Sequence, residues 1–435
     1  MIPLTSGPEQ GKMSVETITP GRWRWGVVGL LTILTVINYA DRGVLGVVGP
    51  ILIKDFHLSP GQFGLVSSAF GWGYSAVLFA SGAIVTALGP VRTYRWFVLL
   101  WSLLIGCTAL VGNFAGLLVV RLFFGGAEGT IFPSSSRVIA NWVTPRERAR
   151  AVGLEGGVGI PLGGLIIVPL ATWLAYSFGW QAPFVLLAIV GVVWVVIGTT
   201  LITDTPAENR FVSTREREFL KEHAAGLASQ TSLSRTPWRR IFLSGTLWQA
   251  GLAFFASAYV LYFLLTFFPT YLVNYKHVPF KSLAILGTLP SIGMIVGAVA
   301  SGFISDWIYR RTGSLRAARS YFAGTCLLAT GVLVGISTLL TNVTAIVAVV
   351  SVAAAVNFMA NPIFFAIPLD AAPEYAAQGA ALTVGLGSLA GIAAPLLTGE
   401  LVQASGTFTS AFFFVAGLPF VFGLLLLATC HPERL

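Results

Sequence analysis

Long runs of hydrophobic residues cover most of this chain, and polar residues occur mainly in the short intervals between them. Each run approaches the roughly 20 residues that a helix needs to cross the hydrocarbon of a bilayer. The pattern therefore predicts an all-α integral membrane protein with twelve transmembrane helices. Their approximate limits are 24–48, 61–88, 94–112, 114–142, 150–176, 182–202, 244–273, 283–309, 321–340, 343–370, 376–404 and 408–429.

One long polar segment separates the first six predicted helices from the last six. We therefore divide the chain into an N-terminal tail (1–23), a six-helix bundle (24–202), a linker (203–243), a second six-helix bundle (244–429) and a C-terminal tail (430–435). Both bundles contain a span with closely spaced glycines before a proline. Such internal duplication is common in transporters, whose substrate site lies near the membrane midplane between the two halves.

The linker contains one stretch that allows two interpretations. Ser213 is followed three residues later by Glu216, which is the pattern of a capped amphipathic helix on a membrane surface. The interpretation that we prefer is a linker whose charged residues are solvated.

Composition supports a membrane protein and disfavours other classes. The chain is 55% hydrophobic and only 10% charged, with a mean hydropathy of +0.82, whereas soluble domains have about 25% charged residues. Its net charge of +9 lies largely in short loops and the linker, so we expect no nucleic-acid partner. No phosphate-binding loop, zinc spacing or nucleophile motif occurs. We expect no enzyme activity, no metal and no cofactor.

The distribution of arginine predicts the orientation. Basic residues concentrate in the loops that follow even-numbered spans, which places those loops inside the cell. Both termini are then cytoplasmic, in a cytoplasmic (inner) membrane. The arginines in these loops are Arg92, Arg95, Arg146, Arg148, Arg150, Arg310, Arg311, Arg316 and Arg319.

Two adjacent charged residues, Asp41 and Arg42, lie inside the first predicted span. A charge at bilayer depth costs about 3 kcal/mol, so it is retained where it faces a protein interior or a watery cavity. Adjacent residues point about 100° apart on a helix, so each needs a partner elsewhere. A guanidinium matches a carboxylate bidentately, which makes Arg42 a candidate anion-binding residue. The alternative is a structural ion pair near the end of the span.

The fourth span carries Arg121 and Glu128, which are seven residues apart and so share one helix face. Arg121 could bind the substrate, or hold the charge of Glu128 when no substrate is present. An anion that diverts the arginine would let Glu128 take up a proton. This hypothesis couples proton and anion transport, and the alternative is a fixed salt bridge.

Other polar residues are weaker candidates. We expect the substrate cavity to include Tyr39, Tyr74, Tyr262, Asn357 and Ser388, although any single residue of this kind is more often a helix-packing hydrogen bond or an interface anchor. Asp306 and Arg310 are expected to form a cytoplasmic gate or to fix a helix end. We expect Glu155 to form an ion pair with Arg148 and Arg150 at the cytoplasmic end of span five.

Two short motifs place these residues in a known family. The run from Asn38 to Arg42 resembles the N-Y-x-D-R signature of the anion:cation symporter family within the major facilitator superfamily. Residues 121–129 resemble the R-x-x-x-G-x-x-E-G element in that family's fourth helix, and Phe132-Pro133 follows. The family includes bacterial sugar-acid carriers such as the galactonate transporter, and the animal sialic-acid (sialin) and vesicular glutamate transporters.

The resemblance implies two pseudo-symmetric six-helix bundles that alternate access to a central site. It implies that Asp41 and Glu128 couple protons, that Arg42 engages a substrate carboxylate and that Arg121 communicates with the acid. Tyr39 and Tyr74 match positions that line the cavity of sugar-acid carriers.

This chain departs from the family pattern at two places. Thr86 stands where the superfamily has an aspartate after the second helix, whereas the second half keeps Asp306. Ile160 stands where galactonate-type carriers have a polar amide. The cavity should then be poorer in polar groups, which favours a less hydroxylated or an aromatic carboxylate over a sugar acid.

We therefore predict a proton-coupled symporter, monomeric in the bilayer, that imports a small organic anion such as a sugar acid or an aromatic acid. One alternative is an anion exchanger or potential-driven anion transporter. Another is a transporter-like sensor that signals through residues 203–243.

Overall fold

The computed structural model describes residues 21–225, 238–371 and 375–432. Most of the predicted N-terminal tail, and parts of the linker and of the C-terminal tail, lie outside these ranges.

The first half of the chain forms long helical segments joined by short turns. They are α1 (Trp23–Asp55), α2 (Pro60–Leu88), α3 (Pro90–Thr108), α4 (Phe114–Glu128), α5 (Ile131–Trp142), α6 (Arg148–Val152), the π-helix η1 (Gly153–Val158), α7 (Gly159–Phe178) and α8 (Ala182–Leu201). Predicted span four is thus two helices, α4 and α5, and span five begins with a π-helical turn.

The described residues of the linker form three short helices, and the second half repeats the long ones. In the linker are η2 (Pro206–Glu208), α9 (Thr214–Ala225) and α10 (Trp238–Leu243). After it come α11 (Gly245–Thr266), α12 (Phe268–Thr270), η3 (Tyr271–Tyr275), η4 (Phe280–Ser282), α13 (Leu283–Leu286), α14 (Leu289–Thr312), η5 (Ala317–Tyr321), α15 (Phe322–Ser337), α16 (Val343–Ala371), α17 (Ala376–Ser388), α18 (Ala390–Ser405) and α19 (Thr409–Thr429).

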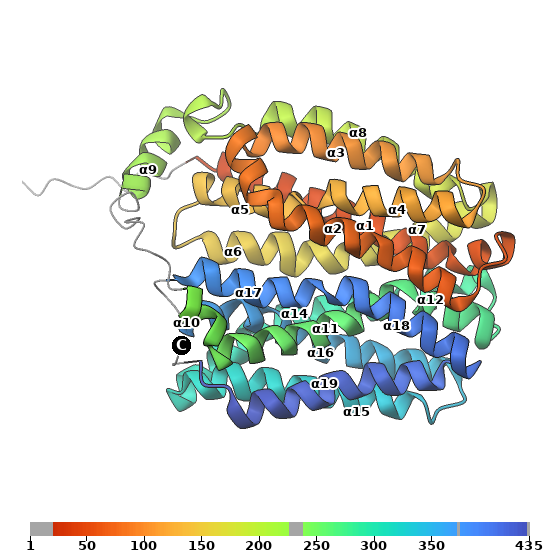
Figure 1. The fold of residues 1–435 in the computed structure, drawn as a ribbon. Coiled ribbons are helices and arrows are strands. Elements are labelled where there is room, and N and C mark those ends of the chain that lie inside the picture. The colour runs from red at the N-terminus through yellow and green to blue at the C-terminus, as the bar shows by residue number, and fades with distance from the viewer. Residues whose placement is uncertain (1–20, 226–237, 372–374, 433–435) are drawn as a thin grey trace, which may run out of the picture.

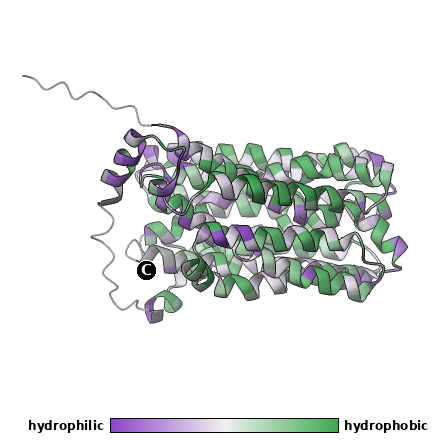
Figure 2. Cartoon of the chain, turned by 90° about the horizontal axis from the view of Figure 1, so that it is seen from above, coloured by the Kyte–Doolittle hydropathy of each residue, from purple (hydrophilic) through white to green (hydrophobic). Residues whose placement is uncertain are grey.

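Eleven segments within the described residues are long and apolar enough to cross a membrane. The remaining predicted span corresponds to α3, which carries Arg92 and Arg95 near its start and packs against α4 and α8. The all-α fold with twelve membrane helices is therefore confirmed. Figure 2 shows hydrophobic residues along the lengths of the helices and hydrophilic residues gathered mainly at their ends, most densely around α9.

Figure 1 shows the helices of the two halves as two stacked groups, with α1 to α8 above and α11 to α19 below. The helices α9 and α10 and the C-terminus lie together at one end of the bundle. We call this the α9 end, and the opposite one the far end. The two halves meet mainly through α1 with α11 and α12, α2 with α18, and α7 with α13 and α14.

Glycines bring the two halves together toward the far end. A Cβ added to Gly64 of α2 would lie 2.5 Å from the carbonyl oxygen of Pro395 in α18. A Cβ on Gly71 would lie 2.7 Å from the backbone of Gly391, and one on Gly46 of α1 would collide with the carbonyl of Leu265. Small residues permit such close approach of membrane helices. The far end is thus closed in this structure.

The linker helix α9 combines the two interpretations, because its residues Arg215, Glu218 and Lys221 are exposed as we preferred while the segment is helical. It is a capped helix, because the Ser213 hydroxyl accepts a hydrogen bond from the Glu216 backbone N–H at 3.3 Å. Glu216 is buried and in turn accepts hydrogen bonds from the backbone N–H groups of Trp23 and Arg24, at 3.2 and 3.1 Å. Helix α9 therefore docks on the start of α1. There the Glu216 carboxylate accepts from backbone N–H groups that have no partner within α1.

Candidate functional site

Helix α1 directs Arg42 toward the centre of the molecule, where it contacts both halves. Its Nε donates a hydrogen bond to Glu128 Oε2 on α4 at 2.9 Å, and both side chains are buried. Its Nη1 donates to the Tyr262 hydroxyl on α11 at 3.2 Å. Arg42 thus finds its acidic partner on another helix, as the 100° offset from Asp41 requires.

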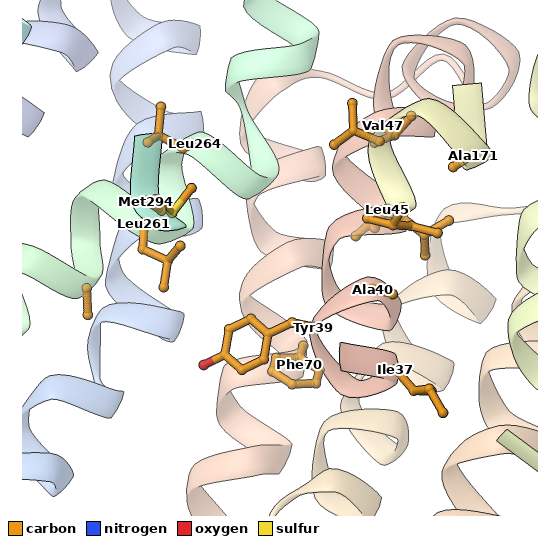
Figure 3. Packing of buried hydrophobic residues seen from close by; sticks show 14 of the residues in the cluster. Ile37, Tyr39, Ala40, Leu45, Val47, Phe70, Ala171, Leu261, Leu264 and Met294 are labelled. Carbon is orange, nitrogen blue, oxygen red and sulfur yellow. The ribbon is translucent and has the colours of Figure 1, made fainter. Parts of the chain in front are cut away.

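Aromatic rings surround the Arg42 guanidinium. Its central carbon lies 4.8 Å from the ring centroids of Tyr39 and Phe70 and 4.7 Å from that of Tyr74. Figure 3 shows the rings of Tyr39 and Phe70 next to each other on the inner faces of α1 and α2. Ring faces stabilise a cation through their quadrupole, by about 2 kcal/mol when water is excluded. The cage holds the guanidinium in place while its Nη2 has no hydrogen-bond partner among the described residues.

Arg121 lies beside Arg42 and does not bind Glu128 in this structure. Its guanidinium carbon is 5.2 Å from the ring centroid of Phe70 and 5.0 Å from that of Phe124. Its Nε and Nη1 are buried without a hydrogen-bond partner in the described part of the chain. The shared helix face was predicted correctly, but the arginine that holds Glu128 here is Arg42 rather than Arg121.

Asp41 is buried within the first half of the molecule, near α3. It is fully buried, and neither carboxyl oxygen has a hydrogen-bond partner within the described ranges. Its electrostatic neighbours are Glu128, Arg121 and Arg42, and the indole of Trp101 on α3 lies close by. A buried acid without a hydrogen-bond partner in the described residues is a candidate for proton exchange or for binding an internal water.

A small cavity lies between the halves beside the two arginines. Its volume is about 20 Å³, enough for a single water molecule. An organic anion therefore requires the surrounding helices to move apart. The cavity is lined by Arg42, Leu45, Gly46, Ser67, Phe70, Arg121, Tyr262, Leu265, Thr266, Gly391 and Pro395. Two positive side chains with free donors thus face a space that both halves enclose, which is an arrangement suited to an anion.

Comparison with known proteins agrees with this geometry. A family model described as the Major Facilitator Superfamily matches residues 31–395. The chain belongs to the Major Facilitator Superfamily. The membership expected from the two motifs is confirmed, and the protein is a membrane transporter rather than an enzyme.

Several curated relatives carry names of organic-anion transporters. The chain is 31% identical to the hexuronate transporter of Bacillus subtilis (strain 168), over 93% of this chain and 94% of the relative. It is 30% identical to a probable galactarate/D-glucarate transporter of Escherichia coli (strain K12), over 94% and 93%. A probable sulfoacetate transporter of Cupriavidus necator is 29% identical, over 89% of each chain.

Among solved structures, the transporter resembles a bacterial homolog of the human lysosomal transporter Spinster in an inward-facing and occupied conformation. The TM-score is 0.75 at 18% sequence identity, and the match covers 95% of this chain and 99% of the other. This likeness supports the fold.

Four other predicted residues of the transporter lie outside the arginine cluster. Asn357 donates a hydrogen bond to the Ser257 carbonyl at 3.1 Å and so ties α16 to α11. The Ser388 hydroxyl donates to the Gly385 carbonyl of its own helix at 2.7 Å. Neither lines the central cavity. Asp306 and Arg310 are exposed near the end of α14, so their gating role stays a prediction.

The prediction that Glu155 pairs with Arg148 and Arg150 is wrong. Glu155 is the one buried residue of η1, and it forms no salt bridge within the described residues. Arg148 instead donates to the Ala140 carbonyl at 3.0 Å, and Arg150 is exposed. The π-helical turn rotates Glu155 inward, away from the arginines that precede it in sequence.

The sequence reasoning missed Phe70 and Phe124 as parts of the site. Phe70 precedes Tyr74 by one helical turn, and Phe124 follows Arg121 by three residues, so each shares a helix face with a predicted site residue. That spacing was available in the sequence. The spacing alone does not show that these aromatic rings face an intramembrane arginine.

Proposed function

We propose that this transporter is a proton-coupled symporter that imports a small organic anion by alternating access. The buried ion pair between Arg42 and Glu128 carries the proposal. It lies beside a cavity that both halves enclose, and Arg42 also hydrogen-bonds to Tyr262 in the second half. A change at this pair therefore acts on the contact between the halves.

The coupling follows from competition for one arginine. An entering carboxylate binds Arg42 and displaces Glu128, whose charge then loses its partner in a buried position. A lone buried carboxylate is costly, so Glu128 takes up a proton when the anion binds. Anion and proton then occupy the site together and leave it together.

Arg121 and Asp41 complete the proposed site. Arg121 offers two free donors into the same region and takes a second anionic or hydroxyl group of the substrate. Asp41 lies within electrostatic reach of both arginines but outside the cavity lining. We assign it a proton rather than a substrate contact.

The relatives guide the choice of substrate. Their names include hexuronate, galactarate, D-glucarate and sulfoacetate. The polar cavity residues here are two arginines, Ser67, Tyr262 and Thr266, which offer few partners for a chain of hydroxyl groups. We therefore propose a small carboxylate or sulfonate, with sugar acids tested first because of the relatives and aromatic acids tested beside them.

The proposal also covers the membrane location, the oligomeric state and the orientation of the protein. We propose that it lies in a cytoplasmic membrane as a monomer, with the α9 end in the cytoplasm. The arginines in the loops at that end support this orientation through the positive-inside rule. The far end, closed in this structure, would then face the outside.

The deciding experiment is uptake into proteoliposomes of purified protein. Labelled hexuronates, aldarates, sulfoacetate and aromatic acids are supplied with and without an inward proton gradient. Gradient-driven accumulation of one class supports symport and identifies the substrate. Uptake that requires a counter-anion inside, and ignores the gradient, would move the function to exchange.

Glu128→Gln provides the test of the coupling residue. The amide can still accept a hydrogen bond from Arg42 but cannot take up a proton. We expect anion counterflow to persist while gradient-driven accumulation falls at least fivefold. The exposed Glu400→Gln is the matched control. Full accumulation by Glu128→Gln would remove this residue from the mechanism.

A further inference from the structure

Glu155 is a buried acid that the proposed coupling at Glu128 does not use. It is 4% exposed, it lies in the π-helix η1, and its Oε1 has no hydrogen-bond partner among the described residues. A lone carboxylate in such a position is costly, so this geometry favours the neutral acid. π-Helical turns occur frequently at functional sites, and this one brings Glu155 into the interior of the first half.

The register between α1 and η1–α7 places Glu155 relative to Asp41. A Cβ on Gly159 would meet the side chain of Thr35, and one on Gly163 would meet that of Tyr39, so residues 124 apart in sequence lie side by side. Glu155 is then level with Leu31, ten residues before Asp41. At 1.5 Å per residue, Glu155 lies about 15 Å closer to the α9 end than Asp41 does.

Polar side chains with free hydrogen-bonding atoms occupy the interval between them. Thr35, Asn38 and Asp41 follow one another at three-residue spacing on α1, and all three are fully buried. Thr35 Oγ1, both polar atoms of the Asn38 amide and both oxygens of Asp41 lack a hydrogen-bond partner in the part of the chain that the structure describes. Buried polar atoms of this kind are commonly satisfied by internal water.

Hydroxyl groups also surround Glu155 at its own level. Ser135 of α5 interacts with the carboxyl group, and its hydroxyl lies 2.8 Å from that of Tyr94 on α3. Trp101, which lies close to Asp41, follows Tyr94 by seven residues and so lies on the same face of α3. Helix α3 thus extends beside both acids.

The helices of the second half that pack against η1 also carry charged groups. Helices α14 and α16 touch η1 from the second half. On α14, Asp306, Arg310 and Arg311 are exposed near its last turns. On α16, Asp370 forms a salt bridge with Arg319 at 2.8 Å. The neighbours identified around Glu155 are Ser135, which interacts with its carboxyl group, and Tyr94, which lies within electrostatic reach of that group.

We propose that Glu155 is a second proton-binding site of the transport cycle, connected to Asp41 by a file of polar groups that includes Asn38 and Thr35. This inference rests on the proposed proton symport and adds the route by which the proton reaches the α9 end. Glu155, as the neutral acid, releases its proton to water at the α9 end. The carboxylate that remains is reprotonated by a proton that leaves the Asp41 carboxyl and passes along waters bound to Asn38 and Thr35.

The test uses Glu155→Gln and Thr35→Val in the full-length protein in proteoliposomes. The first removes the titrating group and the second removes only the hydroxyl, with little change in volume. The controls are Glu400→Gln, which is exposed, and Thr172→Val, whose hydroxyl is already bonded to the Val168 carbonyl of its own helix at 2.6 Å. The readouts are anion counterflow at equal pH, gradient-driven accumulation, and protons taken up per anion measured with an internal pH dye.

We expect Glu155→Gln to keep counterflow within twofold of the wild type while accumulation falls at least fivefold and fewer protons enter per anion. Thr35→Val should slow gradient-driven uptake about threefold without changing counterflow. Wild-type proton counts and accumulation in both variants would overturn the proposal. Equal losses of counterflow and accumulation in Glu155→Gln, with normal Thr35→Val, would show a structural role and also overturn it. A wild-type protein without any proton dependence would instead contradict the proposed symport itself.

Discussion

Three kinds of contact hold Arg42, and each one restricts the position of its guanidinium group. It forms an ion pair with Glu128, a hydrogen bond with Tyr262 and face contacts with surrounding rings. A guanidinium can satisfy all three at once because it is planar and carries five donors. A lysine ammonium at the same position is a point charge without that shape.

Arg42→Lys should therefore lower anion affinity strongly without unfolding the protein. A hydrogen bond to a charged group contributes about 1.5–3 kcal/mol, so the loss of one such contact weakens binding about tenfold or more. The measurement is the concentration of anion that half-saturates counterflow, with the exposed Arg95→Lys as the control. Unchanged half-saturation in Arg42→Lys would show that the substrate does not contact this residue.

At the residue scale the sequence identified the charged residues of the candidate site but not their pairing. Intramembrane charge alone singled out Asp41, Arg42, Arg121 and Glu128. The pairing of Arg42 with Glu128 joins residues 86 positions apart, and no periodicity within one helix reports the rotation of α1 relative to α4. Glu155 was misplaced for a related reason, because a π-helical turn shifts every side chain that follows it.

At the scale of elements, the closure of the far end depends on glycines that leave no space for a side chain. Gly46 of α1 lies against the backbone of Leu265 in α11. Gly82 of α2 lies toward the α9 end, and a Cβ added there would meet nothing within 4 Å. The two positions therefore form a matched pair for testing whether close helix contact controls the cycle.

We expect Gly46→Ala to hold the far end partly open and to reduce transport at least fivefold, whereas Gly82→Ala should transport normally. The opening is measured by the labelling rate of a cysteine at Ser67, which lines the central cavity, with a water-soluble maleimide. The exposed Cys107 is replaced by serine in all variants. Equal labelling rates in the two glycine variants would show that the contact of Gly46 with Leu265 does not control the closure of the far end.

The docking of α9 makes a second element-scale prediction. Glu216 bonds to two backbone N–H groups at the start of α1 and to the Arg24 guanidinium at 3.2 Å. Removing one partner of a buried ion pair costs about 3–5 kcal/mol. Glu216→Ala should therefore lower the apparent Tm of the purified protein by several degrees, while Glu218→Ala, exposed on the same helix, leaves it unchanged. Equal Tm values would mean that α9 is not anchored to α1.

Acid should weaken the same cluster through Glu147. Burial raises the pKa of Glu147, but hydrogen bonds from Arg24 and Thr144 and the Arg24 charge outweigh it, so the net pKa is below its ordinary value. A lowered folded-state pKa gives stabilisation that is present above the unfolded pKa and is lost as pH falls through the folded one. The Tm difference between the wild type and Glu147→Gln should thus be largest near neutral pH and disappear in the acid range. A difference that grew with acid would contradict this sign.

At the scale of the whole molecule, the hydrophobic pattern was sufficient to predict the all-α membrane fold, since each span must satisfy its own backbone in lipid. It could not show which end is closed. That depends on contacts between α2 and α18, whose residues are more than 300 positions apart, and both conformations of an alternating-access cycle have the same sequence. Which end is closed is therefore known from the structure rather than from the sequence, and it can be tested directly.

A crosslink between α2 and α18 at the far end provides that test. The Ser59 hydroxyl donates a hydrogen bond to the Gln403 side chain at 2.7 Å across the two halves. Ser59→Cys with Gln403→Cys, joined by a short bis-methanethiosulfonate crosslinker, should hold the far end closed, and uptake should fall at least tenfold until a reductant restores it. Ser405 and Ser410 have hydroxyls 2.7 Å apart within the second half alone. A crosslink between cysteines at that pair should leave uptake unchanged, because both residues move together. Full uptake by the Ser59–Gln403 crosslinked protein would mean that the far end does not open during transport, and the alternating-access cycle would have to be abandoned.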